Sequence, residues 1–151
     1  MAMVVEQIEG FDLVGLSTRT KNANEADPGT AKITPLWDKF GAEAAPKLRG
    51  TPKVYGVYTN YESDHTGLFD VFACSDMLST EMSEDFKTVH IEPGKYLVFG
   101  AQGEMPQAVI DLWGEVWGHF SAPDCPHERA YTTDFEHYAS PNEVKIAISI
   151  K

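Results

Sequence analysis

An internal repeat is the feature of this sequence that most constrains its fold. Residues 131–150 repeat the aromatic and aliphatic pattern of residues 55–74 at a constant offset of 76, and residues 112–113 repeat residues 36–37 at the same offset. Two copies of this length do not fit a solenoid or a propeller. They predict one small unit used twice around a pseudo-twofold cleft. Chance similarity between two amphipathic segments is the alternative.

The repeat extends toward the N-terminus with one insertion. Residues 11–15 resemble residues 96–100 at an offset of 85, so the first copy holds nine additional residues. Segment 21–30 accommodates them because it is polar and contains Pro28 and Gly29, residues typical of turns. We expect an irregular loop there.

Hydrophobic periodicity predicts a strand-helix-strand-strand order in the first copy. Thr34 and Pro35 form a helix start signal, with the threonine as cap, and Pro46 bounds the helix end. Leu36 and Phe40 then lie on one side at helical spacing. The expected strands cover residues 11–20, 53–61 and 67–75.

The second copy has the same order, with Pro93 and Gly94 as a turn near its start. Its strands are expected at residues 89–101, 128–138 and 143–150, and its helix at residues 106–120. Consecutive strands this close are antiparallel neighbours. We therefore predict a single α+β domain over residues 1–151, with an antiparallel sheet and two main helices. The halves, about residues 1–85 and 86–151, would meet after the polar segment 76–85.

Composition limits the possible partners. The formal net charge of −11 would repel phosphate backbones, so we expect no direct nucleic-acid binding. The N-terminus does not resemble a signal peptide, and no apolar segment is long enough to span a bilayer, so we expect no membrane insertion. Cys74 and Cys125 form no CxxC pair and read as free thiols in a reducing compartment, which favours the cytoplasm.

Glu136 is the strongest candidate for a functional residue. Strand alternation places Thr132, Asp134, Glu136 and Tyr138 on one face, and Tyr131, Thr133, Phe135 and His137 on the other. If the first face lines the cleft, Glu136 is a desolvated acid beside aromatic rings and can pair with a cation. Asp134 and Glu136 could also act as a carboxylate pair. A glutamate on an outer, solvated sheet face is the alternative.

Aromatic residues on the two helices extend this candidate site. Trp113 and Trp117 belong to a helical stripe that also contains Phe120, and such stripes form core more often than binding sites. Trp37 is the repeat partner of Trp113, so both rings would flank the cleft. Tyr58 would point to the face equivalent to that of Glu136.

Metal and cofactor signals are weak. His119, Cys125 and His127 cluster in sequence, but their spacing matches no established zinc pattern. The glycines show neither a dinucleotide-binding nor a P-loop spacing. We expect no metal and no cofactor.

The duplicated unit, the helix at Leu112 and Trp113, and the strand end at residues 135–141 together resemble the GyrI-like effector-binding domain family. The similarity spans nearly the full length. It is strongest to stand-alone members, including integron cassette proteins that bind cationic drugs, through residues 15–20, 33–40 and 55–58. Regulators of this family carry a DNA-binding domain, and this sequence shows no such pattern, so we expect no transcriptional control by this polypeptide alone.

The resemblance implies a ligand pocket between the halves, in which a glutamate among aromatic side chains pairs with lipophilic cations. The matching positions are Glu136, Tyr138, Trp113, Trp117 and Tyr58. The sequence therefore predicts a stand-alone sensor or sequestering protein for lipophilic cations. Two alternatives stay open: a hydrolase of cyclopropane-bearing alkylating compounds, with Glu136 as general acid or base, and an acidic module that binds and inhibits a DNA-processing protein partner.

Overall fold

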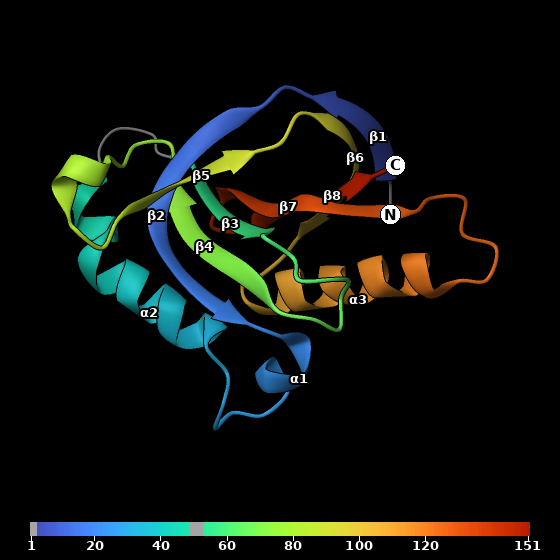
Figure 1. Cartoon of the computed structure of the whole chain (residues 1–151), viewed down its shortest axis with the longest axis horizontal. Helices are drawn as coiled ribbons and strands as arrows, with labels where there is room; N and C mark the ends of the chain where they lie inside the picture. The colour runs from blue at the N-terminus through green and yellow to red at the C-terminus, as the bar shows by residue number, and fades with distance from the viewer. Residues whose placement is uncertain (1–2, 49–52) are drawn as a thin grey trace.

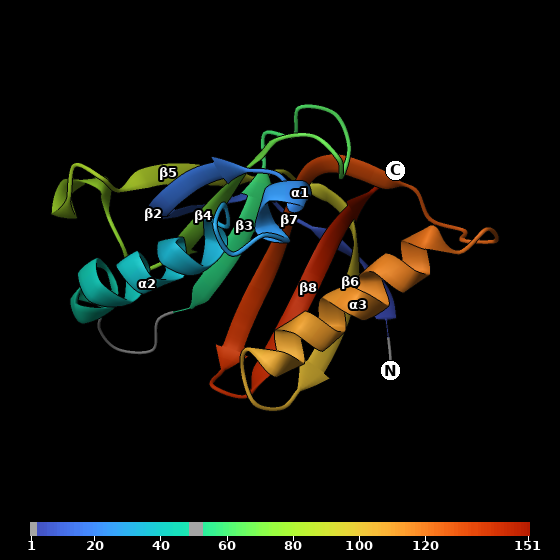
Figure 2. The ribbon, with the colours of Figure 1, turned by 90° about the horizontal axis from the view of Figure 1, so that it is seen from below.

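The computed structural model describes residues 3–48 and 53–151, which form an antiparallel sheet with two main helices on one of its sides (Figure 1 and Figure 2). The strands are β1 (Met3–Ile8), β2 (Phe11–Thr20), β3 (Val54–Thr59), β4 (Phe69–Ser75), β5 (Lys87–Ile91), β6 (Gly94–Gln102), β7 (Arg129–Ser140) and β8 (Glu143–Ile150). The helices are α1 (Asn22–Glu25), α2 (Ile33–Glu43) and α3 (Gln107–Ser121), with 3-10 turns η1 (Ala45–Lys47) and η2 (Thr80–Met82). The predicted α+β class is confirmed.

The strand order is symmetric about the centre of the sheet, which agrees with the predicted duplication. The sheet runs β1-β6-β8-β7-β3-β4-β2-β5, so that β7-β8-β6 on one side of the centre matches β3-β4-β2 on the other. Tyr58 and Asp134, which the repeat offset of 76 relates, lie directly opposite each other in the β3–β7 pair. The pseudo-twofold axis therefore passes between these two residues.

The outermost strands are exchanged between the halves. β1 leads into β2 along the chain but pairs with β6, and β5 leads into β6 but pairs with β2. The predicted strand over residues 89–101 is divided in two, because Glu92 and Pro93 separate β5 from β6, which begins at Gly94 with a φ of +153°. β1 was not predicted because nearly all of its side chains are exposed, which leaves no alternating pattern to detect.

Strong curvature of the sheet creates a core without any helix. β7 and β2 are three strand positions apart, which is about 14 Å in a flat sheet, yet the ring centroids of Phe135 and Phe11 are 5.9 Å apart. Phe135 also packs against the rings of Tyr55 and Tyr96. The sheet therefore closes over its own apolar face, and the helices cover the opposite face.

The two main helices cover different parts of that second face. In α2, Leu36 and Phe40 are buried against β2 and β4, and in α3, Leu112 and Val116 are buried against β6 and β8. Trp113 is only partly buried, so the aromatic stripe of α3 borders the core. In the described part of the chain, none of the helices has the length and apolar character that crossing a membrane requires.

The start of α2 differs from the prediction. The helix begins at Ile33, and no side chain at its N-cap position caps it, so Thr34 is not the cap. Instead, the Glu25 carboxylate accepts hydrogen bonds from the backbone N–H groups of Lys32 and Ile33, at 2.9 and 3.0 Å. A carboxylate there satisfies free N–H groups and complements the helix dipole. The predicted loop over residues 21–30 therefore contains α1, which presents this cap.

Replacing Phe135 should test the closed apolar face. We expect Phe135→Ala to lower the free energy of unfolding by about 3–5 kcal/mol, because it removes a buried ring and leaves a cavity among three aromatic neighbours. Urea unfolding followed by circular dichroism measures the change. Ile110 is 57% exposed, so Ile110→Ala should change the free energy of unfolding by less than about 0.5 kcal/mol. Equal losses in the two variants would contradict this account of the core.

Candidate functional site

A pocket of about 430 Å³ lies between α2 and α3, on the helix side of the sheet. The helices supply its walls, and β3 and β7 supply its floor. Its volume falls in the range typical of small-molecule sites. The lining residues are Ile33, Thr34, Trp37, Asp38, Tyr58, Met105, Pro106, Val109, Ile110, Trp113, Glu136 and Tyr138.

Three aromatic side chains hold the carboxylate of Glu136 at this floor. The indole N–H of Trp113 and the hydroxyl of Tyr58 donate to Oε2, at 2.5 and 3.1 Å, and the hydroxyl of Tyr138 donates to Oε1 at 2.9 Å. These donors come from α3, β3 and β7, so the carboxylate is fixed from three elements. The strand alternation predicted from sequence is correct at Glu136.

Glu136 is a buried acid without a cationic partner. Its side chain is only 4% exposed, and no lysine, arginine or histidine within residues 3–48 and 53–151 forms an ion pair with it. Burial raises the pKa of Glu136, and the three hydrogen bonds counteract part of that rise. Burial and the nearby carboxylate keep the pKa of Tyr58 well above its ordinary value, so its hydroxyl stays a donor.

Aromatic rings surround this carboxylate. The Trp37 ring lies edge-on to Tyr138, with centroids 5.7 Å apart, and Trp113 lies edge-on to Tyr58 at 5.4 Å. Five of the six residues predicted from the sequence, Glu136, Tyr138, Trp113, Tyr58 and Trp37, therefore line one pocket. Met105, Pro106, Val109 and Ile110 form an apolar wall, and Ile33, Thr34 and Asp38 complete the lining.

The sixth predicted residue, Trp117, lines a neighbouring pocket of about 170 Å³. This second pocket shares Ile33, Tyr58 and Trp113 with the first, so the two are adjacent. Trp117 packs between Trp113 and His65, with ring centroids 6.5 and 5.4 Å away. Glu136 is not among the residues that line this second pocket.

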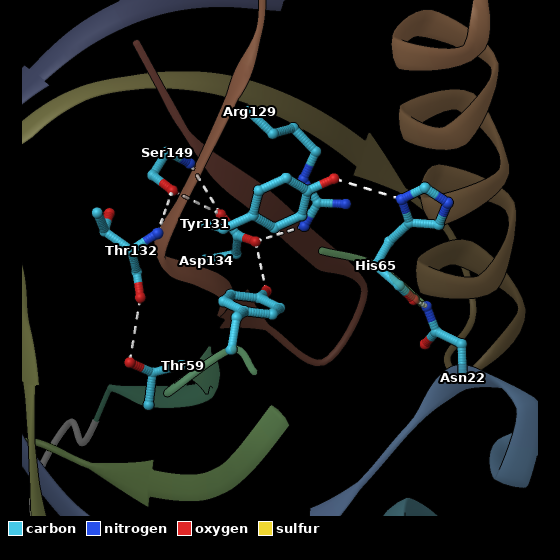
Figure 3. A network of polar contacts seen from close by, with 9 residues as sticks. Asn22, Thr59, His65, Arg129, Tyr131, Thr132, Asp134 and Ser149 are labelled. Atoms are coloured by element: carbon cyan, nitrogen blue, oxygen red, sulfur yellow. Dashed lines mark hydrogen bonds and ion pairs between the residues drawn. The ribbon is translucent and has the colours of Figure 1, made fainter. Parts of the chain in front are cut away.

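Asp134 is a second buried acid, and both of its carboxylate oxygens are bonded to other groups of the protein (Figure 3). Its Oδ2 accepts from Arg129 Nη2 at 2.6 Å and from the Tyr61 hydroxyl at 2.5 Å. Its Oδ1 accepts from the backbone N–H and the hydroxyl of Ser149, at 2.9 and 3.1 Å. Asp134 thus has a cationic partner and four hydrogen bonds. The suggested carboxylate pair with Glu136 does not form a free acid–base couple.

Arg129 is held by two aromatic faces as well as by Asp134. Its guanidinium lies 4.6 Å from the Tyr131 ring centroid and 5.6 Å from that of Trp117. The prediction that Tyr131 lies on the opposite face from Asp134 is wrong. Tyr131 has a φ of +55°, and the β7–β8 register shifts between Arg129 and Asp134, so alternation fails in this part of β7.

Sequence reasoning missed Arg129 and the apolar wall formed by Met105, Val109 and Ile110. A basic residue at the start of a strand gives no signal by itself, although a buried arginine requires a partner. The apolar wall gives none, because its residues follow the same helical pattern as the core. Its position depends on how α2 and α3 sit relative to each other.

Solved structures with this fold include one of high sequence identity. An integron cassette protein, VCH_CASS2, from the mobile metagenome of Vibrio cholerae is 55% identical, with a TM-score of 0.95 over 99% of this chain and 95% of that one. SAV2435 bound to tetraphenylphosphonium is 21% identical, with a TM-score of 0.72 over 100% and 94% of the two chains. The C-terminal domain of EcmrR is 9% identical, with a TM-score of 0.61 over 99% and 97%. The last two share the fold.

The family comparison covers nearly the whole sequence. Among curated proteins we found no significant match. Residues 5–150 match the family described as Cass2, integron-associated effector binding protein. The resemblance to GyrI-like effector-binding domains is confirmed, including the resemblance to integron cassette proteins. The chain belongs to the Cass2 family of integron-associated effector binding proteins.

Proposed function

We propose that this protein binds lipophilic organic cations in the pocket between α2 and α3, with Glu136 as the counter-charge. The observation that carries the proposal is a buried carboxylate that three aromatic donors orient and that has no cationic partner in the described chain. Burying an ion without a partner is unfavourable. A ligand that brings the missing positive charge relieves this cost.

The aromatic lining favours cations whose charge is spread over a bulky apolar body. A cation over the face of a tryptophan or tyrosine ring gains about 0.5–2 kcal/mol per ring, and four such rings line the pocket: Trp37, Tyr58, Trp113 and Tyr138. Small hydrated cations would lose their water of hydration without making contacts to the apolar wall of the pocket. The pocket should therefore prefer lipophilic cations to alkali or simple ammonium ions.

Several features favour breadth over strict selectivity. The apolar wall includes Met105, whose flexible thioether adapts to ligands of different shape. Glu136 supplies charge without the fixed set of donors that recognises one particular ligand. The net charge of −11 also raises the concentration of cations near the protein. The bound tetraphenylphosphonium of SAV2435, a protein of the same fold, supports this ligand class.

The geometry favours binding over hydrolysis. As general acid or base, Glu136 would have to exchange a proton with a substrate or a water molecule. Both of its oxygens already accept hydrogen bonds from side chains of three different elements. This arrangement suits a stationary charge, so we infer binding without covalent change of the ligand.

Gly56 leaves the space that the carboxylate occupies. Gly56 and Glu136 are direct partners in the β3–β7 pair. A Cβ atom at position 56 would lie 2.5 Å from Oε1 of Glu136 and 3.2 Å from the Trp37 ring. Any larger residue must therefore displace the charged group, the ring or both.

Removing the charge should weaken binding without removing the fold. We expect Glu136→Gln to reduce the affinity for tetraphenylphosphonium by at least about 10-fold, since a desolvated charge pair is lost. Tryptophan fluorescence titration or calorimetry measures this change. Glu115→Gln removes a charge from an exposed position on α3 and should bind as the wild type does. Equal binding by wild type and Glu136→Gln would contradict the proposed counter-charge.

Binding should depend on the ionisation of Glu136. Because burial raises the pKa of this acid, its protonated form becomes populated at a higher pH than for an exposed glutamate. Below that pKa, the affinity for tetraphenylphosphonium should fall by up to about 10-fold per pH unit. This probe has a permanent charge, so the ligand does not titrate. The dependence should vanish in Glu136→Gln, and a flat wild-type profile across acidic pH would exclude charge pairing.

Filling the space at Gly56 should also impair binding. We expect Gly56→Ala to lower the affinity for tetraphenylphosphonium, because the new methyl group displaces the Glu136 carboxylate or the Trp37 ring. Gly114→Ala is the matched control, since a Cβ at position 114 meets no atom within 4 Å. The control should retain affinity and gain up to about 1 kcal/mol of stability from better helix propensity. Unchanged affinity in Gly56→Ala would show that the carboxylate position is not critical.

A further inference from the structure

Three metal-ligating side chains meet at the C-terminal end of α3, away from Glu136. His119 lies in the last turn of α3, and Cys125 and His127 lie in the connection to β7. One ring nitrogen from each histidine and the cysteine sulfur all lie within 4.8 Å of one another. Residues separated by up to eight positions are thus brought together by the turn that follows the helix.

The distances are close to those of a coordinated metal ion. Nε2 of His119 and Nδ1 of His127 are 3.0 Å apart. Two nitrogens bound to one tetrahedral Zn²⁺ at about 2.0–2.1 Å would be roughly 3.3 Å apart, so the rings need only a small separation. Cys125 Sγ now donates to the carbonyl oxygen of His127 at 3.3 Å. A change in its χ1 rotamer can redirect the sulfur without moving a strand.

Neighbouring aromatic rings hold His119 in place. The His119 ring packs edge-on against Phe99 and Phe120, with centroids 5.8 and 5.1 Å away. All three candidate ligands are partly buried. A partly buried position limits competition from water but leaves a route for an ion. His127 also lines a solvent-facing pocket of about 550 Å³, toward which a further ligand position can open.

We propose that His119, Cys125 and His127 form a binding site for a borderline transition-metal ion, with Zn²⁺ as the best match. Two imidazoles and a thiolate favour Zn²⁺ or Co²⁺ over Mg²⁺ or Ca²⁺, which prefer oxygen ligands. Three protein ligands leave a fourth position for water. The sequence analysis expected no metal because the spacing matches no established pattern; the proposal rests on the folded geometry.

Proton balance follows from this ligand set. Each neutral imidazole keeps its one hydrogen on the ring nitrogen that faces away from the ion, so the histidines only change tautomer. The thiol of Cys125 loses its proton when the sulfur binds the metal, and that proton goes to solvent. Binding therefore releases one proton per ion and weakens as the pH falls. The site is independent of Glu136 and of the cation pocket.

Cobalt substitution tests the site on the full-length chain without a histidine tag. We expect one Co²⁺ per chain, displaceable by Zn²⁺, with visible bands typical of tetrahedral cobalt and a near-ultraviolet sulfur-to-cobalt charge-transfer band. Cys125→Ser should abolish the charge-transfer band while Cys74 remains present. His127→Gln and His119→Gln should each weaken binding by at least about 10-fold, since even outer-shell changes cost about 10–100-fold.

His90→Gln is the matched control, because it removes an exposed histidine that pairs with Asp12 elsewhere on the surface. It should bind Co²⁺ as the wild type does. The proposal is overturned if the wild type binds no Co²⁺ or Zn²⁺, if Cys125→Ser retains the charge-transfer band, or if His127→Gln binds as tightly as the control. Thermal unfolding without metal identifies any variant whose loss of binding reflects misfolding.

Discussion

The antiparallel register between β3 and β7 is the constraint on which the pocket depends. It places Gly56 opposite Glu136 and Tyr58 opposite Asp134, directly at the pseudo-twofold axis. Because successive side chains alternate between the faces of a strand, a shift of one residue would turn Glu136 toward the closed apolar core. The same pairing leaves the Glu136 carboxylate in reach of donors on α3, β3 and β7.

The duplication supplies a symmetric scaffold, but the chemistry at the axis is asymmetric. The offset of 76 relates Glu136 to Asn60 and Asp134 to Tyr58, so each carboxylate occurs in one half only. Both acids are buried, but their environments differ: Asp134 pairs with Arg129, whereas neutral donors hold Glu136. The ion pair of Asp134 stabilises the fold. Glu136 lacks a positive charge beside it, and in the proposed function a cationic ligand supplies that charge.

The fold was largely predictable because hydrophobic periodicity is local in sequence and the repeat keeps a constant offset of 76 residues. Glu136, Tyr138, Tyr58, Trp37 and Trp113 were predicted, and all line one pocket, since strand alternation and helical spacing determine their faces. The exchange of β1 and β5 was not predictable, because the exposed side chains of β1 carry no pattern and the alternation in β5 does not specify its distant partner strand. The predicted face of Tyr131 is wrong for a different reason, because a local backbone irregularity in β7 breaks the alternation of side chains. The proximity of His119, Cys125 and His127 was not predictable either, because it depends on the geometry of the turn after α3, which their spacing in the sequence does not determine.

The exchange of edge strands limits how the molecule can adapt to its ligands. Main-chain hydrogen bonds join the halves at three places: between β1 and β6, between β3 and β7, and between β2 and β5. A hinge motion that widened the cleft would have to break these ladders. In the proposed function, ligands of different size are therefore accommodated by rotamer changes of Trp37, Met105 and neighbouring side chains. The tolerance for ligands of different shape that we propose therefore depends on side chains of the pocket and not on movement of the backbone.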